Sequence, residues 1–185
     1  MNSLLPFDEL NRLEVTLPQH FENGRIRSKK DCEDIIDELL DLFLLAYANG
    51  VTDSNMTLGA DIQPSLDDVM NTIDKKVVGK TWRERVEDYF ENGGTEADIM
   101  RIAETEAHRD SNEAAYKTAR EAGATEKIWH CMMLPTSRDT HIYLDGVSAP
   151  IDGEFYSFKG GSTQFPGQWG IAEEDVNCLC WLTYA

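Results

Sequence analysis

The residues best suited to chemistry lie in the C-terminal third of the sequence. Cys178 and Cys180 are two positions apart and would point to the same side of an extended strand. With Cys131 and His141 they could supply the four ligands of a tetrahedral zinc site. The C-x-C spacing supports a metal less well than C-x-x-C does, and two cysteines on one strand face are commonly packed in a core. We therefore expect reduced, buried thiols without metal, with zinc as the alternative, and we expect no cofactor.

A second candidate group is Arg138-Asp-Thr-His141. An arginine and a histidine could stabilise a phosphoryl transition state and move protons, as in a metal-free nuclease. Equally, Arg138 could bind backbone carbonyls or an acid such as Asp145, while His141 satisfies a buried polar group. The phosphate-loop, nucleophile-elbow and zinc-protease motifs are all missing from the sequence. We therefore prefer the structural interpretation, and the sequence predicts no catalytic residue and no standalone enzyme.

The charge and composition limit the partners of the chain. Its 34 acidic and 17 basic residues give a net charge of −17, so a broad face for DNA phosphates is not expected and DNA should bind weakly at most. The N-terminus has no secretion signal, and no apolar run approaches the roughly 20 residues that cross a bilayer. Four cysteines in 185 residues do not make a disulfide scaffold. We expect a protein that does not enter membranes and is present in a host cytoplasm before it is packaged.

The elements that must position these side chains change character near residue 122. Apolar residues recur at helical spacing from Asp31 to a stop at Asn49-Gly50, and again from Ser65 to Asn92, where Gly79 would kink or split the helix. A third helix is expected from Thr95 to Ala122. It carries a stripe of small and apolar residues that would place it at the centre, namely Ile99, Ile102, Ala103, Ala107, Ala114, Ala115 and Ala119.

After residue 122 the sequence favours short strands and turns. Strands are expected over residues 127–133, 154–158 and 178–184, with turns at Asp145-Gly146 and Asp152-Gly153. The predicted fold class is α+β, with a helical N-terminal half packed on a small, mostly antiparallel C-terminal sheet.

The first thirty residues are predicted to form an extended arm. They contain Pro6, Pro18 and the turn-like Asn23-Gly24. Their apolar residues have no obvious core to bury them, so we expect them to bind a partner; these are Leu4, Leu5, Phe7, Leu10 and Leu13.

Taken in order, the motifs of residues 95–184 resemble the C-terminal domain of the phage Mu F-like minor head proteins, the head morphogenesis family. The matching residues are Trp129, Arg138, His141, Asp145, Gly146, Phe155, Pro166, Gly167, Asn177, Cys178 and Cys180, with Thr105, Glu106 and Asn112 on the preceding helix. The chain departs from the family pattern at Glu104 and Leu179, and it lacks an acid shortly after Trp129.

The resemblance implies a structural minor capsid protein of a tailed bacteriophage. It would lie in the virion head, associate with the portal, capsid or scaffold protein, and serve head assembly or DNA delivery. Together with the patterns described above, it divides the chain into an expected arm (1–30), a helical region (31–94) and a Mu F-like domain (95–185), and no fused toxin domain is expected. Two alternatives remain, a phage-encoded nuclease or effector built on Arg138 and His141, and an adaptor stabilised by zinc.

Overall fold

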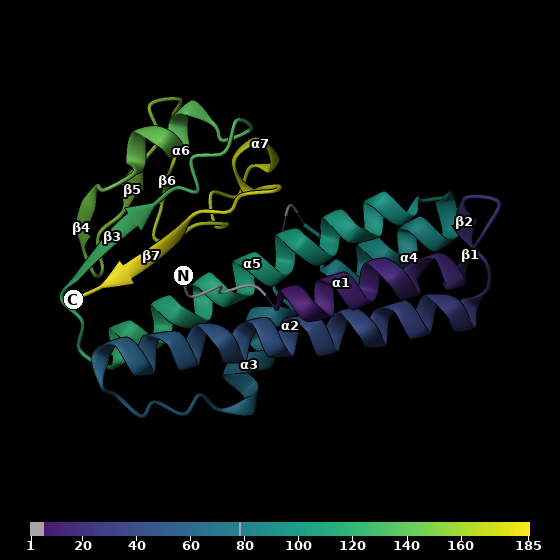
Figure 1. Ribbon diagram of the computed structural model, residues 1–185, viewed down its shortest axis with the longest axis horizontal. Coiled ribbons are helices and arrows are strands. Elements are labelled where there is room, and N and C mark those ends of the chain that lie inside the picture. Colours follow the sequence, from purple (N-terminus) through teal and green to yellow (C-terminus); the bar gives the residue numbers. More distant parts are fainter. Residues whose placement is uncertain (1–5, 78) are drawn as a thin grey trace.

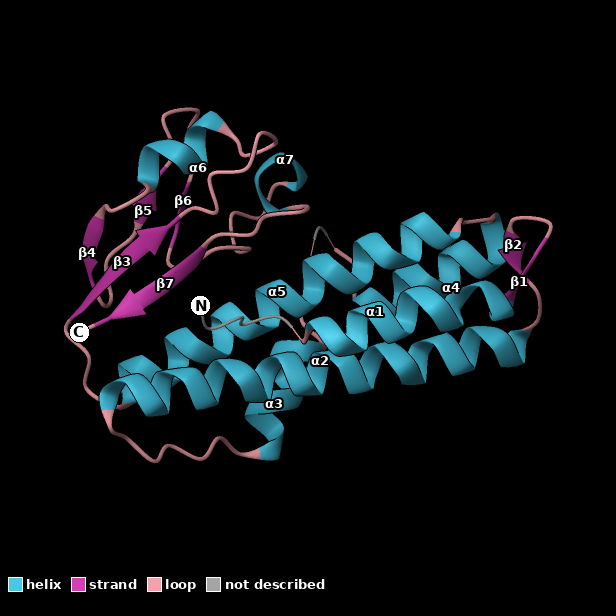
Figure 2. Cartoon of the chain, viewed as in Figure 1, coloured by secondary structure: helices cyan, strands magenta, loops and turns pink. Residues whose placement is uncertain are grey.

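The computed structural model describes residues 6–77 and 79–185 and has the α+β architecture that the sequence predicts (Figure 1). Helices dominate the N-terminal half and strands occur mainly in the C-terminal part (Figure 2). The N-terminal elements are α1 (Phe7–Thr16), a 3-10 turn (Leu17–His20), β1 (Phe21–Glu22), β2 (Arg25–Ile26), α2 (Lys29–Leu58), α3 (Leu66–Ile73), α4 (Trp82–Asn92) and α5 (Glu96–Glu121). None of the helices in the described ranges is long and apolar enough to span a bilayer.

The C-terminal part is a small antiparallel sheet with two short helices. Its elements are β3 (Glu126–His130), α6 (Asp139–Leu144), β4 (Ser148–Pro150), β5 (Phe155–Tyr156), β6 (Ser162–Thr163), α7 (Ala172–Asp175) and β7 (Trp181–Tyr184). The order of the three-stranded sheet is β4-β3-β7, and Lys127 of β3 lies opposite Ala149 and Tyr184. A separate hairpin joins β5 to β6. Strand β3, the middle strand of the three-stranded sheet, follows shortly after α5. Its Trp129 is buried in the core.

Helix α5 is the central element, as its small residues predict. It begins with a capping box in which Thr95 and Asp98 satisfy each other's backbone N–H groups. It lies along α2 for most of its length (Figure 1). Its first half belongs to the core of the helical bundle and its last turns to the core of the C-terminal sheet. Every residue of the predicted small-residue stripe is buried.

The predicted end at Gly50 of the helix that starts near Asp31 is wrong. Helix α2 runs on to Leu58 and ends at Gly59, which has a φ of 63°. Gly50 instead lies where α2 meets α5, and a Cβ atom added there would be 2.2 Å from the carbonyl oxygen of Ser111. Glycine is common at helix ends, which is why the sequence suggested a stop at this position. In the structure Gly50 instead allows two helices to approach each other closely.

The prediction of an extended arm is also wrong for the described residues. Residues 7–16 form a helix, and Leu10 and Leu13 lie in the core of the helical bundle. Phe7 is exposed, while Leu4 and Leu5 lie outside the described residues. Deleting residues 1–30 would therefore open this core and would not leave the rest of the fold intact. The prolines mislead because Pro6 and Pro18 occupy the starts of helical turns, where a missing N–H is harmless.

The buried Lys127 should make the stability of the folded protein depend on pH in the alkaline range. Its ammonium group donates to the carbonyl of Gln164 at 2.9 Å and lies over the ring of Tyr116. Burial lowers the pKa of Lys127 from 10.5 to about 8. In the unfolded chain the lysine keeps its proton up to its ordinary pKa, so Lys127 makes the folded state more stable as pH rises from about 8 to 10.5.

We expect Lys127→Met to remove this rise, on the order of 2–3 kcal/mol across that range. Urea unfolding of both proteins at several pH values measures the difference, with the exposed Lys159→Met as the control. Parallel pH profiles for the original protein and the Lys127 variant would contradict the expectation.

Candidate functional site

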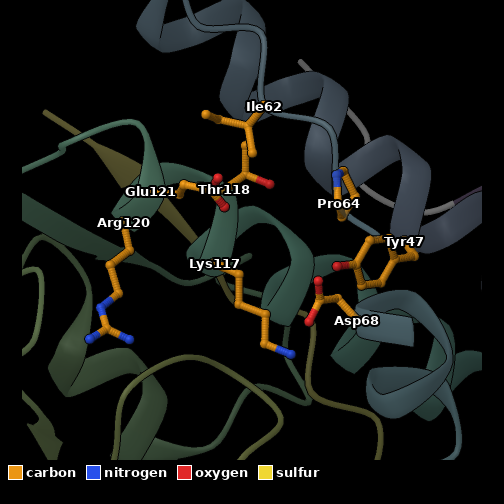
Figure 3. A pocket seen from close by; sticks show the side chains of 8 residues that line it. All are labelled: Tyr47, Ile62, Pro64, Asp68, Lys117, Thr118, Arg120 and Glu121. Atoms are coloured by element: carbon orange, nitrogen blue, oxygen red, sulfur yellow. The ribbon is translucent and has the colours of Figure 1, made fainter. Parts of the chain in front are cut away.

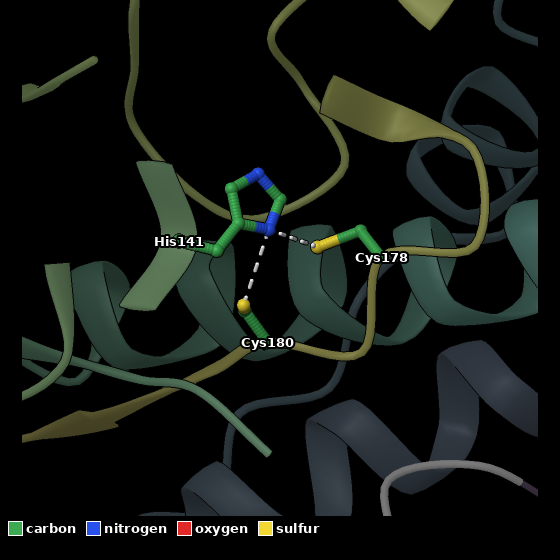
Figure 4. Close-up of side chains that lie close together, drawn as sticks. All are labelled: His141, Cys178 and Cys180. Carbon is green, nitrogen blue, oxygen red and sulfur yellow. Dashed lines mark hydrogen bonds between the residues drawn. The ribbon is translucent and has the colours of Figure 1, made fainter. Parts of the chain in front are cut away.

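Three of the predicted site residues converge in the core of the C-terminal part (Figure 4). Nδ1 of His141 lies 3.4 Å from Sγ of Cys180 and 3.6 Å from Sγ of Cys178. The histidine comes from α6, and the two cysteines come from the segment that leads into β7. All three side chains are buried. Residues separated by almost forty positions thus meet at one nitrogen atom.

The imidazole of His141 is held from its other side by an acid. Its Nε2 lies 3.1 Å from Oε2 of Glu174 on α7, and that oxygen accepts a hydrogen bond of 2.8 Å from Thr140. The rings of Trp129 and Trp169 pack against the imidazole at 5.9 and 6.2 Å between centroids. A carboxylate at Nε2 favours the tautomer with its proton there, which leaves the lone pair of Nδ1 facing the sulfurs.

The cysteine segment is fastened to α5 through its backbone. The carbonyl of Cys180 accepts hydrogen bonds from Nε2 of His108 at 2.6 Å and from the side-chain amide of Asn112 at 3.2 Å. Burial lowers the pKa of His108, so the neutral imidazole that donates here is favoured. The backbone N–H of Asn177, at a φ of 56°, lies 3.4 Å from Oγ1 of Thr105 and donates to it.

The two thiols affect each other's ionisation. A hydrogen bond from Cys180 lowers the pKa of the Cys178 thiol, and a hydrogen bond with His141 lowers it further. The same hydrogen bond, together with burial, raises the pKa of Cys180. Cys178 is therefore the thiol that more readily becomes a thiolate.

The remaining predicted site residues surround these three. Cys131 is buried, and its backbone N–H donates to Asp145 at 2.8 Å. Gly146, at a φ of 75°, donates its N–H to the carbonyl of Trp129 at 2.8 Å. Arg138 donates to the carbonyl of Val176, which is the kind of contact that the structural interpretation expects. The nuclease alternative is not favoured, because Arg138 and His141 are both engaged by neighbours within the fold.

A small cavity of about 40 Å³ adjoins the three converging side chains. His141, Cys178 and Cys180 line it, together with Cys131, Arg138 and Asn177. A cavity of this size has room for about one or two water molecules.

Sequence reasoning missed Glu174, Thr140 and Trp169. The predicted loop of residues 160–170 and the turns after it carried no periodic signal. Glu174 is one acid among three in a row, Glu173 to Asp175, and nothing in that run marks Glu174 as the one that reaches His141. Only the folded chain brings Glu174 to His141.

A larger cavity of about 400 Å³ lies on the helical side, between α2, the segment before α3 and the end of α5 (Figure 3). Lys117 and Arg120 line it. Both cations already have acidic partners, since Lys117 pairs with Glu113 at 2.9 Å and Arg120 with Asp152 at 2.8 Å. The cavity therefore has no strong arrangement for a charged ligand.

Two known proteins are similar to part of this chain. NAD(+)–arginine ADP-ribosyltransferase EFV of Enterococcus faecalis is 39% identical over 85 residues, which are 44% of this chain and 17% of that protein. Minor head protein GP7 of Bacillus phage SPP1 is 33% identical over 85 residues, which are 44% of this chain and 28% of that protein. The chain thus spans less than a third of the length of either relative. No family model matches the chain, and no solved structure matches it.

These relatives correct one expectation and support another in part. The sequence led us to predict that the chain is not an enzyme, and the relative with the higher identity contradicts this, because it is named as an ADP-ribosyltransferase. The predicted likeness to phage head proteins is supported at a coarser level: part of this chain is similar to a minor head protein of a bacteriophage.

Proposed function

We propose that this chain is a structural minor capsid (head morphogenesis) protein of a tailed bacteriophage. In this proposal it associates with the portal or the head interior and is needed for head assembly or DNA delivery. Its place is the virion head, after a period in the host cytoplasm during assembly. The observation that carries the proposal is the similarity to minor head protein GP7 over 44% of the chain. The region 95–185, which contains all the motif residues, would be the Mu F-like domain.

The charge and surface of the protein fit this role. A net charge of −17 keeps an acidic protein from adhering to packaged DNA, so its affinity for the head must come from apolar and specific polar contacts. Because Leu10 and Leu13 are in the core, we look for the partner surface elsewhere. We place it on exposed apolar side chains of the C-terminal part, where Tyr143 of α6 and Phe158 are exposed and their rings lie 5.8 Å apart.

Co-expression with the portal protein of its phage tests this proposal. We expect the full-length protein to co-purify with portal and to appear in heads seen by electron microscopy. We expect Tyr143→Ser with Phe158→Ser to reduce incorporation at least several-fold while the domain stays folded. Met56→Ser is a matched control, since Met56 is equally exposed but lies on α2. A full-length protein that never associates with portal or head would refute the assignment.

The ADP-ribosyltransferase relative favours a second candidate function, the transfer of ADP-ribose from NAD⁺ to arginine. This candidate rests on the similarity alone, because both cations that line the cavity of about 400 Å³ are already paired. Incubation with labelled NAD⁺ and an arginine-rich acceptor tests it. Labelled acceptor would support the second candidate, and its absence would leave the head-protein proposal as the better one.

A further inference from the structure

We propose that His141, Cys178 and Cys180 bind a single Zn²⁺ ion through Nδ1 and the two Sγ atoms. The distances between the three ligand atoms carry this inference. In a tetrahedral site with Zn–S near 2.3 Å and Zn–N near 2.0–2.1 Å, the nitrogen and each sulfur are about 3.6 Å apart. The observed separations are 3.4 and 3.6 Å. Two edges of the tetrahedron are thus already present in the fold.

A metal also explains why two sulfurs approach the same nitrogen. The Nδ1 atom of His141 has one lone pair in the ring plane and can accept one thiol proton well. Cys178 and Cys180 are both within 3.6 Å of it. If both were thiols, they would compete for that lone pair. A cation among the three atoms is bound by all of them at once.

The contacts of His141 beyond the three ligand atoms are those of a metal-binding histidine. Ligating histidines usually donate their other ring N–H to a carboxylate, which fixes the tautomer and makes the ligand more basic. Here Nε2 lies 3.1 Å from Glu174, and Thr140 holds the same carboxylate. The rings of Trp129, edge-on, and Trp169, stacked, both pack against the imidazole. The imidazole is therefore oriented before any ion arrives.

The charges around the three ligands favour a cation. Two thiolates and Zn²⁺ sum to zero, the buried acids Glu174 and Asp175 lie nearby, and Arg138 lines the adjoining cavity. Glu174 is 3% exposed, and within the described residues its ion pair is with His141. A buried carboxylate beside a neutral imidazole is costly. A metal on the far side of the ring polarises the Nε2–H and so stabilises that carboxylate.

The fourth coordination position is assigned to a water molecule in the adjoining cavity. All three ligands line that cavity, and its volume of about 40 Å³ accommodates a water. Cys131 lines it too but lies outside the cluster of three, so the proposal needs only three protein ligands. A site with an open position keeps the ion accessible, unlike a site closed by four side chains.

Native mass spectrometry with elemental analysis tests the site on the full chain, purified under reducing conditions from zinc-supplemented cells. We expect one zinc ion per chain and a fall in Tm when a chelator removes it. We expect Cys178→Ser with Cys180→Ser to lose the zinc. Cys32→Ser should keep it, because Cys32 is a buried cysteine of the helical bundle.

A spectroscopic measurement on the unaltered chain covers the case in which the cysteine variants do not fold. Co²⁺ added to the metal-free protein should give the absorption of tetrahedral cobalt with thiolate-to-metal charge transfer, and Zn²⁺ should displace it. The proposal is overturned if the purified chain contains far less than one zinc per molecule and binds neither Zn²⁺ nor Co²⁺. It is equally overturned if the double-serine variant folds and retains its zinc.

Discussion

Replacing Arg109 by methionine is expected to lower the free energy of unfolding by about 3–5 kcal/mol, because it removes a buried cation from Glu106 and Asp110 and leaves Glu106 paired with Arg85 alone among the described residues. Arg109 is only 3% exposed and lies on α5, where the two cores meet. Its guanidinium group pairs with Glu106 and lies 2.7 Å from Asp110. It also donates to the carbonyl of Thr72 at 3.3 Å. Methionine keeps the volume but provides none of these donors.

A compensated variant distinguishes lost charge from lost packing. Adding Glu106→Gln and Asp110→Asn to Arg109→Met removes the two buried acids that Arg109 contacts, and we expect part of the stability to return. Arg101→Met is the surface control. Arg101 is half exposed and pairs with Asp98 at 3.0 Å, so its loss should cost at most about 1 kcal/mol. Denaturant unfolding at neutral pH measures all three. A loss below about 1 kcal/mol for Arg109→Met would show that the buried charges are not coupled as the structure indicates.

The start and the central position of α5 were predicted from the sequence, but the burial of the polar residues in its middle was not. The Thr95 cap and the small residues are local signals, and both are found in the structure. Nothing in the spacing of residues 106–113 indicated that their polar side chains would be buried, as they are in the structure. They are buried because α2, α3, β7 and the loop at Gly167 all pack against α5. Gly167 itself approaches the backbone of Arg109 so closely that a Cβ would lie 3.2 Å from its Cα.

The candidate site, too, could be predicted from the sequence only in part. The C-x-C pair and the Arg-x-x-His group were found from spacing within a few residues. Their convergence could not be found, because it depends on α6 and on the segment before β7, and α6 was not predicted. The sequence favoured metal-free thiols because C-x-C spacing supports a metal less well than C-x-x-C does. The distances of 3.4 and 3.6 Å are the observation on which the proposed zinc site rests instead.

The N-terminal region shows the limit of reading prolines as helix breakers. Leu10, Leu13 and Leu17 are spaced at three and four residues, which is a helical pattern. The prolines on either side outweighed that pattern in the sequence interpretation. In the structure Pro6 precedes α1 and Pro18 opens a 3-10 turn, so neither interrupts a hydrogen-bonded turn.

Replacing Gly50 by alanine is expected to lower the free energy of unfolding by about 3 kcal/mol, at the upper end of the usual cost of overpacking. Helix propensity alone predicts the opposite sign, since alanine stabilises a helix interior by roughly 1 kcal/mol relative to glycine. Steric overlap outweighs helix propensity here, because the new Cβ would lie 2.2 Å from the carbonyl oxygen of Ser111 and 3.1 Å from Cβ of Ala114. The oxygen belongs to the backbone of α5, so no side chain can rotate away. The long α2 and α5 helices must separate, and both cores that α5 joins lose packing.

Asn49→Ala separates the two contributions, because Asn49 precedes Gly50 on the same helix and is only half-buried. That substitution raises helix propensity without placing a new atom against α5, so a change within about 0.5 kcal/mol is expected. Thermal and urea unfolding of the two variants give the comparison, and near-ultraviolet circular dichroism reports whether the buried aromatic residues are still held. If Gly50→Ala is as stable as the unaltered protein, α2 and α5 do not approach as closely as the structure shows, and the central position of α5 loses its main support.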